Sequence, residues 1–131
     1  MYNKNPQETQ EKVFFRLIQK GKYSVFGKDH YFKDINSYLD FCKHVPIRTY
    51  EEIFSYIDQI RRGENDVLWP GKIKWFAKSS GTTNDKSKYI PISKESLEHC
   101  HFKAGKDMLA LYCNNYPETN IYNGKSLMLG G

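Results

Sequence analysis

Hydrophobic residues near the start of the chain recur at helical spacing. They fall on one face of residues 9–20, and Gly21 follows as a stop, which predicts an amphipathic helix. The predicted face consists of Val13, Phe14, Leu17 and Ile18. Residues 21–36 show no such spacing, so we expect them to be irregular.

Two more helices are predicted before the middle of the chain. Ser37 precedes an apolar cluster and starts a short helix, which Pro46 must end because the residue before a proline avoids helical angles. Thr49 and Glu52 form a capping box, so a third helix begins there and ends at Gly63. Its predicted buried face consists of Ile53, Ile57 and Ile60.

The second half of the chain combines strands with a long helix. Residues 73–77 and 89–92 are rich in β-forming side chains and predict two strands that flank a polar loop. Ser93 is expected to cap a fourth helix, which residues 114–117 close. Its predicted apolar face consists of Leu97, Cys100, Ala104, Met108 and Leu111. A third strand is predicted over residues 126–129.

This order of elements, about four helices with a few β-strands, indicates an α/β architecture. A chain of 131 residues suffices for one domain with a core, or for part of a domain. A strand that ran into the terminus at Gly131 would leave a sheet edge unpaired. We therefore expect the natural protein to continue, and the isolated chain to self-associate through that edge.

Charge and cysteine content narrow the class of partner. Twenty lysines and arginines against 15 aspartates and glutamates give a net charge of +5, which favours anionic partners. The basic residues are scattered, whereas nucleic-acid binding proteins gather them in a stripe. Three cysteines without a CxxC pair fit a reducing cytoplasm. Because the basic residues are scattered, we do not expect nucleic acid as a partner. No run of about 18 apolar residues occurs, so we do not expect a membrane as a partner either.

Several residues outside the polar loop have reactive or aromatic side chains but are not assigned to a site. His99, Cys100 and His101 are neighbours in a predicted helix, where successive side chains diverge by about 100°. These three side chains therefore cannot converge on one metal ion. Cys42 and Cys113 are expected to be small buried hydrophobes. Trp69 and Trp75 are expected to pack in the core rather than stack on nucleobases. No catalytic residue is assigned.

The polar loop between the two predicted strands has the composition of a phosphate-binding site. Residues 79–88 read Ser-Ser-Gly-Thr-Thr-Asn-Asp-Lys-Ser-Lys. Gly81 allows successive backbone amides to point into one concavity, and Lys88 adds a positive charge. Hydroxyl groups that can donate hydrogen bonds to phosphate come from Ser79, Ser80, Thr82 and Thr83.

An ordinary polar hairpin connection is the alternative for this loop. Serine, threonine, asparagine and glycine also make ordinary hairpin connections, and composition alone slightly favours that interpretation. A Walker loop is excluded elsewhere in the chain, because Gly124-Lys125-Ser126 matches only the end of that motif and Thr119 stands where its first glycine belongs.

The wider sequence resembles a known family. Phe-Ala-Lys-Ser-Ser-Gly-Thr-Thr from Phe76, followed by Lys88, is similar to the first nucleotide motif of adenylate-forming enzymes. Four further stretches are Phe26-Gly27, Val45-Pro46-Ile47-Arg48 with Tyr50-Glu51, Arg62-Gly63-Glu64 and Leu68-Trp69-Pro70-Gly71. Together they resemble the auxin-responsive Gretchen-Hagen family of acyl-acid amido synthetases, and bacterial members of it most, over nearly the whole chain.

The resemblance implies an ATP-dependent ligase. It implies that residues 1–131 are the amino-terminal part of a large adenylation domain, with the rest of that domain and a small carboxy-terminal domain absent. The complete enzyme would use ATP and Mg²⁺ to activate a carboxylic acid as an acyl-adenylate and transfer it to an amine, with an amino acid as the expected acceptor. The six loop residues Ser79, Ser80, Gly81, Thr82, Thr83 and Lys88 would bind ATP, and the fragment alone would be inactive.

One departure from the family pattern concerns the turn of the loop. Plant members usually have a glycine where this chain has Asp85, so Asn84 and Asp85 must form the turn here. The alternative to the ligase is a self-contained basic module that binds nucleic acid or a protein and uses residues 79–88 only as a turn.

Overall fold

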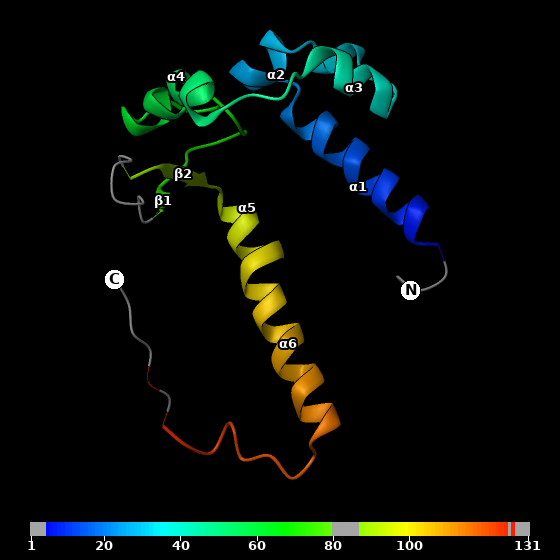
Figure 1. Cartoon of the computed structure of the whole chain (residues 1–131), viewed down its shortest axis with the longest axis vertical. Helices are drawn as coiled ribbons and strands as arrows, with labels where there is room; N and C mark the ends of the chain where they lie inside the picture. Colours follow the sequence, from blue (N-terminus) through cyan, green and yellow to red (C-terminus); the bar gives the residue numbers. More distant parts are fainter. Residues whose placement is uncertain (1–4, 80–86, 126, 128–131) are drawn as a thin grey trace. The chain divides into compact units, whose positions relative to one another are not determined.

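The computed structural model describes residues 5–79, 87–125 and 127 (Figure 1). The chain forms two compact units, Met1–Ser93 and Lys94–Gly131, and each is described by itself. The first contains helices and a two-stranded sheet, and the second contains a long helical segment. The predicted α/β class is confirmed.

The first helix, α1 (Pro6–Gly21), begins earlier than the hydrophobic spacing indicates. The Asn5 side chain accepts a hydrogen bond from the backbone N–H of Glu8, and Pro6 occupies the first turn, where no N–H is needed. Of the predicted apolar face only Ile18 is buried, whereas Val13 is 39% and Leu17 is 43% exposed. Fewer residues of α1 are therefore buried than the hydrophobic spacing predicts.

The prediction that residues 21–36 are irregular is wrong. They contain α2 (Val25–Asp29), which Ser24 caps, and the 3₁₀ helix η1 (Phe32–Asp34). This segment supplies Phe32 and Ile35, which form a hydrophobic core cluster with Ile18. The half-buried residues that pack against this cluster are Phe14, Phe26, Phe41 and Val45. Helices this short do not complete enough turns to produce a hydrophobic period, so the pattern missed them.

Gly27 allows α2 to approach the end of α1 closely. A Cβ atom at this position would lie 2.2 Å from the carbonyl oxygen of Gly21. Ser24 joins the same two elements, because its hydroxyl donates to the Gly21 oxygen at 2.7 Å and accepts from the Gly27 N–H at 3.0 Å. The contact therefore depends on the absence of a side chain at residue 27.

The next two helices follow their predicted caps. α3 (Tyr38–His44) starts after Ser37, whose side chain accepts from the backbone of Asp40. α4 (Tyr50–Arg61) starts after Thr49, and both hydrogen bonds of the predicted capping box are present. Ile53 is half-buried, whereas Ile57 and Ile60 are buried, and Gly63 follows the helix with a left-handed φ of 92°.

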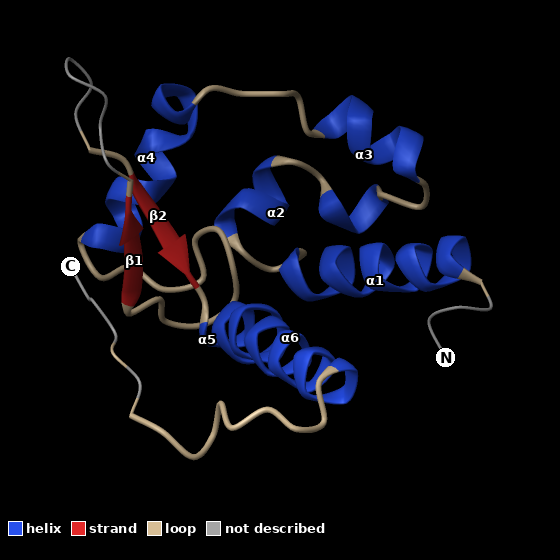
Figure 2. Cartoon of the chain, turned by 60° about the horizontal axis from the view of Figure 1, so that its bottom comes forward, coloured by secondary structure: helices blue, strands red, loops and turns tan. Residues whose placement is uncertain are grey.

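The sheet is an antiparallel hairpin of β1 (Trp75–Lys78) and β2 (Tyr89–Ile92), shown as red arrows in Figure 2. Trp75 pairs with Ile92 and Lys78 with Tyr89. The second strand is placed as predicted, and the first is displaced toward the loop. Trp75 is 61% exposed, so the expectation of core packing is wrong for this residue, whereas Trp69 is half-buried. A two-stranded sheet buries a face only where another element covers it.

The second unit confirms the predicted fourth helix over residues 94–115. It consists of α5 (Lys94–Ser96), a π-helical turn η2 (Leu97–His101) and α6 (Phe102–Asn115) in succession. The π-helical turn was not predicted. Within residues 94–115 no side chain is buried, and Met108 and Leu111 are 65% and 64% exposed. The strand predicted for residues 126–129 lies outside the described residues except for Leu127, which is not in a strand.

Candidate phosphate-binding site

The two ends of the predicted phosphate loop are joined by one backbone hydrogen bond and one hydrogen bond from the backbone to a side chain. The Ser79 N–H donates to the Lys88 carbonyl oxygen at 3.0 Å, and the Lys88 N–H donates to Ser79 Oγ at 3.3 Å. They close the loop directly beyond the last strand pair, Lys78 and Tyr89. Because Ser79 Oγ accepts here, its own hydroxyl hydrogen is still available to a ligand.

The structure thus brings together two of the six predicted site residues, Ser79 and Lys88. Ser80, Gly81, Thr82 and Thr83 lie outside the described residues, as do residues 84–86, which include the turn at Asp85. The described geometry fixes where the loop begins and ends.

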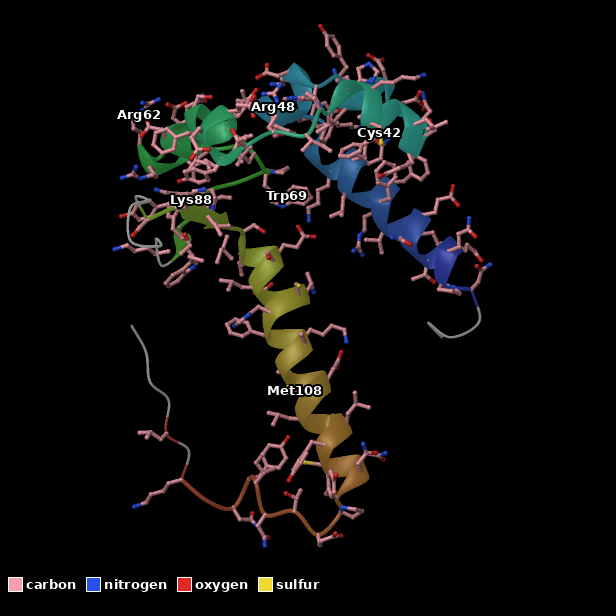
Figure 3. All side chains as sticks on the ribbon, viewed as in Figure 1. Cys42, Arg48, Arg62, Trp69, Lys88 and Met108 are labelled. Atoms are coloured by element: carbon pink, nitrogen blue, oxygen red, sulfur yellow. The ribbon has the colours of Figure 1, made fainter. Side chains whose placement is uncertain are left out.

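Lys88 lies beside the first turn of α4. Its Nζ is 3.8 Å from Glu51 Oε1 and 5.5 Å from the centre of the Tyr50 ring. Lys88 is labelled in Figure 3. The Lys88 side chain is 40% and the Glu51 side chain 71% exposed. An ion pair this long and this exposed contributes little stability, so Glu51 is a weak competitor for the lysine. The ammonium group therefore remains accessible to an anionic ligand.

Tyr50 attaches α4 to the edge of β2. Its hydroxyl accepts from the Tyr89 N–H at 2.9 Å and faces the Tyr89 carbonyl oxygen at 3.4 Å, to which it donates. The backbone N–H and C=O groups of successive residues in a strand point to opposite sides. The Lys88 carbonyl points toward the β1 side, where it accepts from Ser79, so the N–H and C=O of Tyr89 point away from β1. One side-chain hydroxyl therefore satisfies both outward groups of Tyr89.

A second residue of α4 also contacts Tyr89. The Arg61 guanidinium carbon lies 4.6 Å from the centre of the Tyr89 ring, a favourable arrangement for a cation and an aromatic face. No sequence pattern indicated the contacts of Tyr50 and Arg61. Tyr50 and Tyr89 are 39 residues apart in the chain, and no local pattern reports a pairing over that separation.

The start of α4 is itself fixed by hydrogen bonds. The Thr49 N–H donates to Glu52 Oε2 at 2.6 Å, and Thr49 Oγ1 accepts from the Glu52 N–H at 3.4 Å. Hydrogen bonds from the backbone and then from the hydroxyl of Thr49 hold the pKa of the Glu52 carboxyl below its ordinary value. Glu52 is thus held as the carboxylate, the form that caps the helix.

Other candidate residues do not assemble into a site in the described part of the chain. Cys42 and Cys100 are exposed and Cys113 is half-buried, so the expectation of a buried Cys42 is wrong.

Among the described residues, no three His, Cys, Asp or Glu side chains gather as metal ligands would. No helix in the described ranges is both long enough and apolar enough to cross a membrane.

Comparison of the sequence with known proteins places the chain in a family. The family described as GH3 family N-terminal domain matches residues 1–129. Indole-3-acetic acid-amido synthetase GH3.15 of Arabidopsis thaliana is 45% identical over 98 residues, which cover 72% of this chain and 16% of the relative. Jasmonoyl--L-amino acid synthetase JAR4 of Nicotiana attenuata is 25% identical over 125 residues, which cover 95% of this chain and 21% of the relative.

A third relative has a different acid in its name. The 4-substituted benzoates-glutamate ligase GH3.12 of Arabidopsis thaliana is 38% identical over 63 residues, which cover 47% of this chain and 11% of the relative. The chain thus spans about a fifth or less of the length of these relatives. With a family match over nearly its whole length, the chain belongs to the GH3 family, the Gretchen-Hagen family that its sequence resembles.

Proposed function

We propose that this chain is the amino-terminal part of the large domain of an ATP-dependent acyl-acid amido synthetase, and that residues 79–88 bind the β- and γ-phosphates of ATP. The observation that carries the proposal is the closed end of the hairpin. There Ser79 and Lys88 are bonded to each other, and the lysine ammonium is partly exposed. A loop fixed at both ends orients its amides and hydroxyls toward one ligand better than a free polar connection would.

The proposed reaction has two steps. A carboxylate oxygen attacks the α-phosphorus of ATP, the bond from that phosphorus to the bridging oxygen breaks, and pyrophosphate leaves. The amine of the acceptor then attacks the acyl carbon, AMP leaves and the amine loses a proton. The names of the relatives support an acid and an amino acid as the two substrates.

The first step needs positive charge near the leaving group. Two anions repel as the carboxylate approaches, and negative charge accumulates on the departing pyrophosphate. The Lys88 ammonium is suited to offset that charge, and the Ser79 hydroxyl to donate a hydrogen bond to a phosphate oxygen. Ser80, Gly81, Thr82 and Thr83 are proposed to contribute amides and hydroxyls on sequence grounds alone.

Magnesium would add further positive charge to the phosphates when bound with ATP. The described residues contain no cluster of three acidic, histidine or cysteine side chains. Glu51 is the carboxylate nearest Lys88 among the described contacts, and it is paired with that lysine. We therefore propose that the ATP phosphates would hold the metal.

Replacing Lys88 in the full-length protein tests the proposal. Lys88→Ala removes a partly exposed cation from the hairpin, and we expect ATP–pyrophosphate exchange to fall about tenfold or more. Lys28→Ala, which removes the same charge from an exposed position on α2, is the matched control. Exchange at the parental rate by Lys88→Ala, with every acid that the parent accepts, would refute the role of Lys88.

A further inference from the structure

We infer that Tyr50 is a positioning residue for the phosphate site, acting through Lys88 from the first turn of α4. The inference rests on the proposed function, because it gives Tyr50 a part in ATP binding. It follows from two contacts that one side chain makes, one with the β2 backbone through its hydroxyl and one with the Lys88 ammonium across its ring.

The hydroxyl fixes the strand at the residue directly after Lys88. It accepts from the Tyr89 N–H at 2.9 Å and donates to the Tyr89 carbonyl at 3.4 Å. On the opposite side, the Lys88 backbone is bonded to Ser79. The backbone at residues 88 and 89 is thus held from both sides, by β1 and by α4. An edge strand with one bonded side would otherwise leave the Tyr89 groups to water.

The ring limits where the lysine side chain goes. The Lys88 ammonium lies 5.5 Å from the centre of the Tyr50 ring, within the range where an aromatic face attracts a cation. A four-carbon side chain that is 40% exposed would otherwise sample many rotamers. The Tyr50 ring favours rotamers that stay beside the hairpin.

Tyr50 can do this because its own position is fixed. It is the first residue of α4, directly after Thr49, whose hydrogen bonds with Glu52 set the start of the helix. The order of support therefore runs from the capping box to Tyr50, and from Tyr50 to Tyr89 and Lys88. Small displacements of a charged group cost catalysis heavily, about 100-fold for roughly 1 Å in some enzymes, so such support has a functional consequence.

Two substitutions in the full-length protein separate the two contacts. Tyr50→Phe keeps the ring and removes the hydroxyl, and Tyr50→Leu removes both. We expect the KM for ATP to rise about threefold to tenfold in Tyr50→Phe and further in Tyr50→Leu, with the KM for the acid unchanged. Tyr23→Phe is the matched control, because the Tyr23 ring also lies near lysine ammonium groups, those of Lys22 and Lys33, and Tyr23 precedes α2 rather than α4.

A double-mutant cycle shows whether Tyr50 acts through Lys88. In a Lys88→Ala background, Tyr50→Phe should have no further effect on the KM for ATP, because the group that Tyr50 positions is gone. An undiminished effect in that background, or equal increases in the KM for ATP and for the acid, would overturn the inference. The nearly isosteric Phe variant keeps the test decisive even if Tyr50→Leu does not fold.

The same measurements distinguish failure of the inference from failure of the proposed function. If Lys88→Ala raises the KM for ATP and both Tyr50 variants leave it at the parental value, the positioning role is wrong and the phosphate site stands. If Lys88→Ala itself leaves the KM for ATP unchanged, the phosphate site is wrong, and the positioning role is refuted with it.

Discussion

The helices of the first unit and the long helix of residues 94–115 differ in how much apolar surface they bury. In α4, Ile57 and Ile60 are 2% and 3% exposed, whereas in α6 Met108 and Leu111 are 65% and 64% exposed. Both helices are amphipathic in sequence, so the pattern that predicts a helix does not predict whether its apolar face is covered. An apolar face is buried only where other segments pack against it. Among the described residues, such segments occur in the first unit and not in the second.

Two glycines show the same contrast at single positions. A Cβ atom at Gly27 in α2 would lie 2.2 Å from the Gly21 oxygen, whereas one at Gly105 in α6 would have nothing within 4 Å. Both are helical glycines that look alike in sequence. The surroundings of each decide whether an added methyl group causes a clash or only restricts the unfolded chain.

Gly27→Ala should have the largest effect on stability. The new methyl group must push α2 away from the end of α1 and disturb the Ser24 hydrogen bonds, so we expect the free energy of unfolding to fall by about 3 kcal/mol. Urea denaturation of the 131-residue chain measures it. Lys28→Ala, an exposed change on the same helix, is the control and should be nearly neutral. A Gly27→Ala chain as stable as the parent would mean that the close contact of α1 and α2 is misplaced.

Thr49→Ala should destabilise the first unit by about 1 kcal/mol, because α4 loses its cap. Ser55→Ala removes a hydroxyl from an exposed position inside the same helix, and it should be neutral or slightly stabilising. Thermal unfolding compares the two variants. Equal midpoints would show that Thr49 does not cap α4.

Gly105→Ala should give the smallest change and the opposite sign. A methyl group in open space on α6 meets no obstacle, and alanine favours the helix, so we expect stabilisation by about 0.5 to 1 kcal/mol in the 131-residue chain. Circular dichroism during thermal unfolding detects it. A loss of stability would show that the surroundings of Gly105 are crowded. The same substitution in the full-length protein then reports whether a later segment packs on α6.

The sequence predicted the elements with local signals and missed those without them. Ser37 and the pair Thr49 and Glu52 marked helix starts correctly, because a cap is formed by residues that are neighbours in the chain. The short α2 and η1 were missed, although Ser24 is a cap signal that could have found α2. Five helical residues leave too little periodicity to support that signal.

The candidate site divides in the same way. Composition and family resemblance identified Ser79 and Lys88, and the structure places them against each other. Tyr50, Glu51 and Arg61 contact the hairpin from α4, and no rule of spacing connects a helix to a strand that follows dozens of residues later. Such contacts depend on tertiary packing, which a single sequence does not display.

Binding of ATP and of AMP to the full-length protein and to its Lys88→Ala variant tests the assignment of residues 79–88 most directly. AMP lacks the β- and γ-phosphates, so a lysine that contacts them should distinguish the two nucleotides. Isothermal titration calorimetry should show ATP affinity reduced about tenfold in Lys88→Ala and AMP affinity changed by less than about twofold. Equal losses for both nucleotides, or an unchanged affinity for ATP, would contradict the placement of the ATP phosphates at this hairpin.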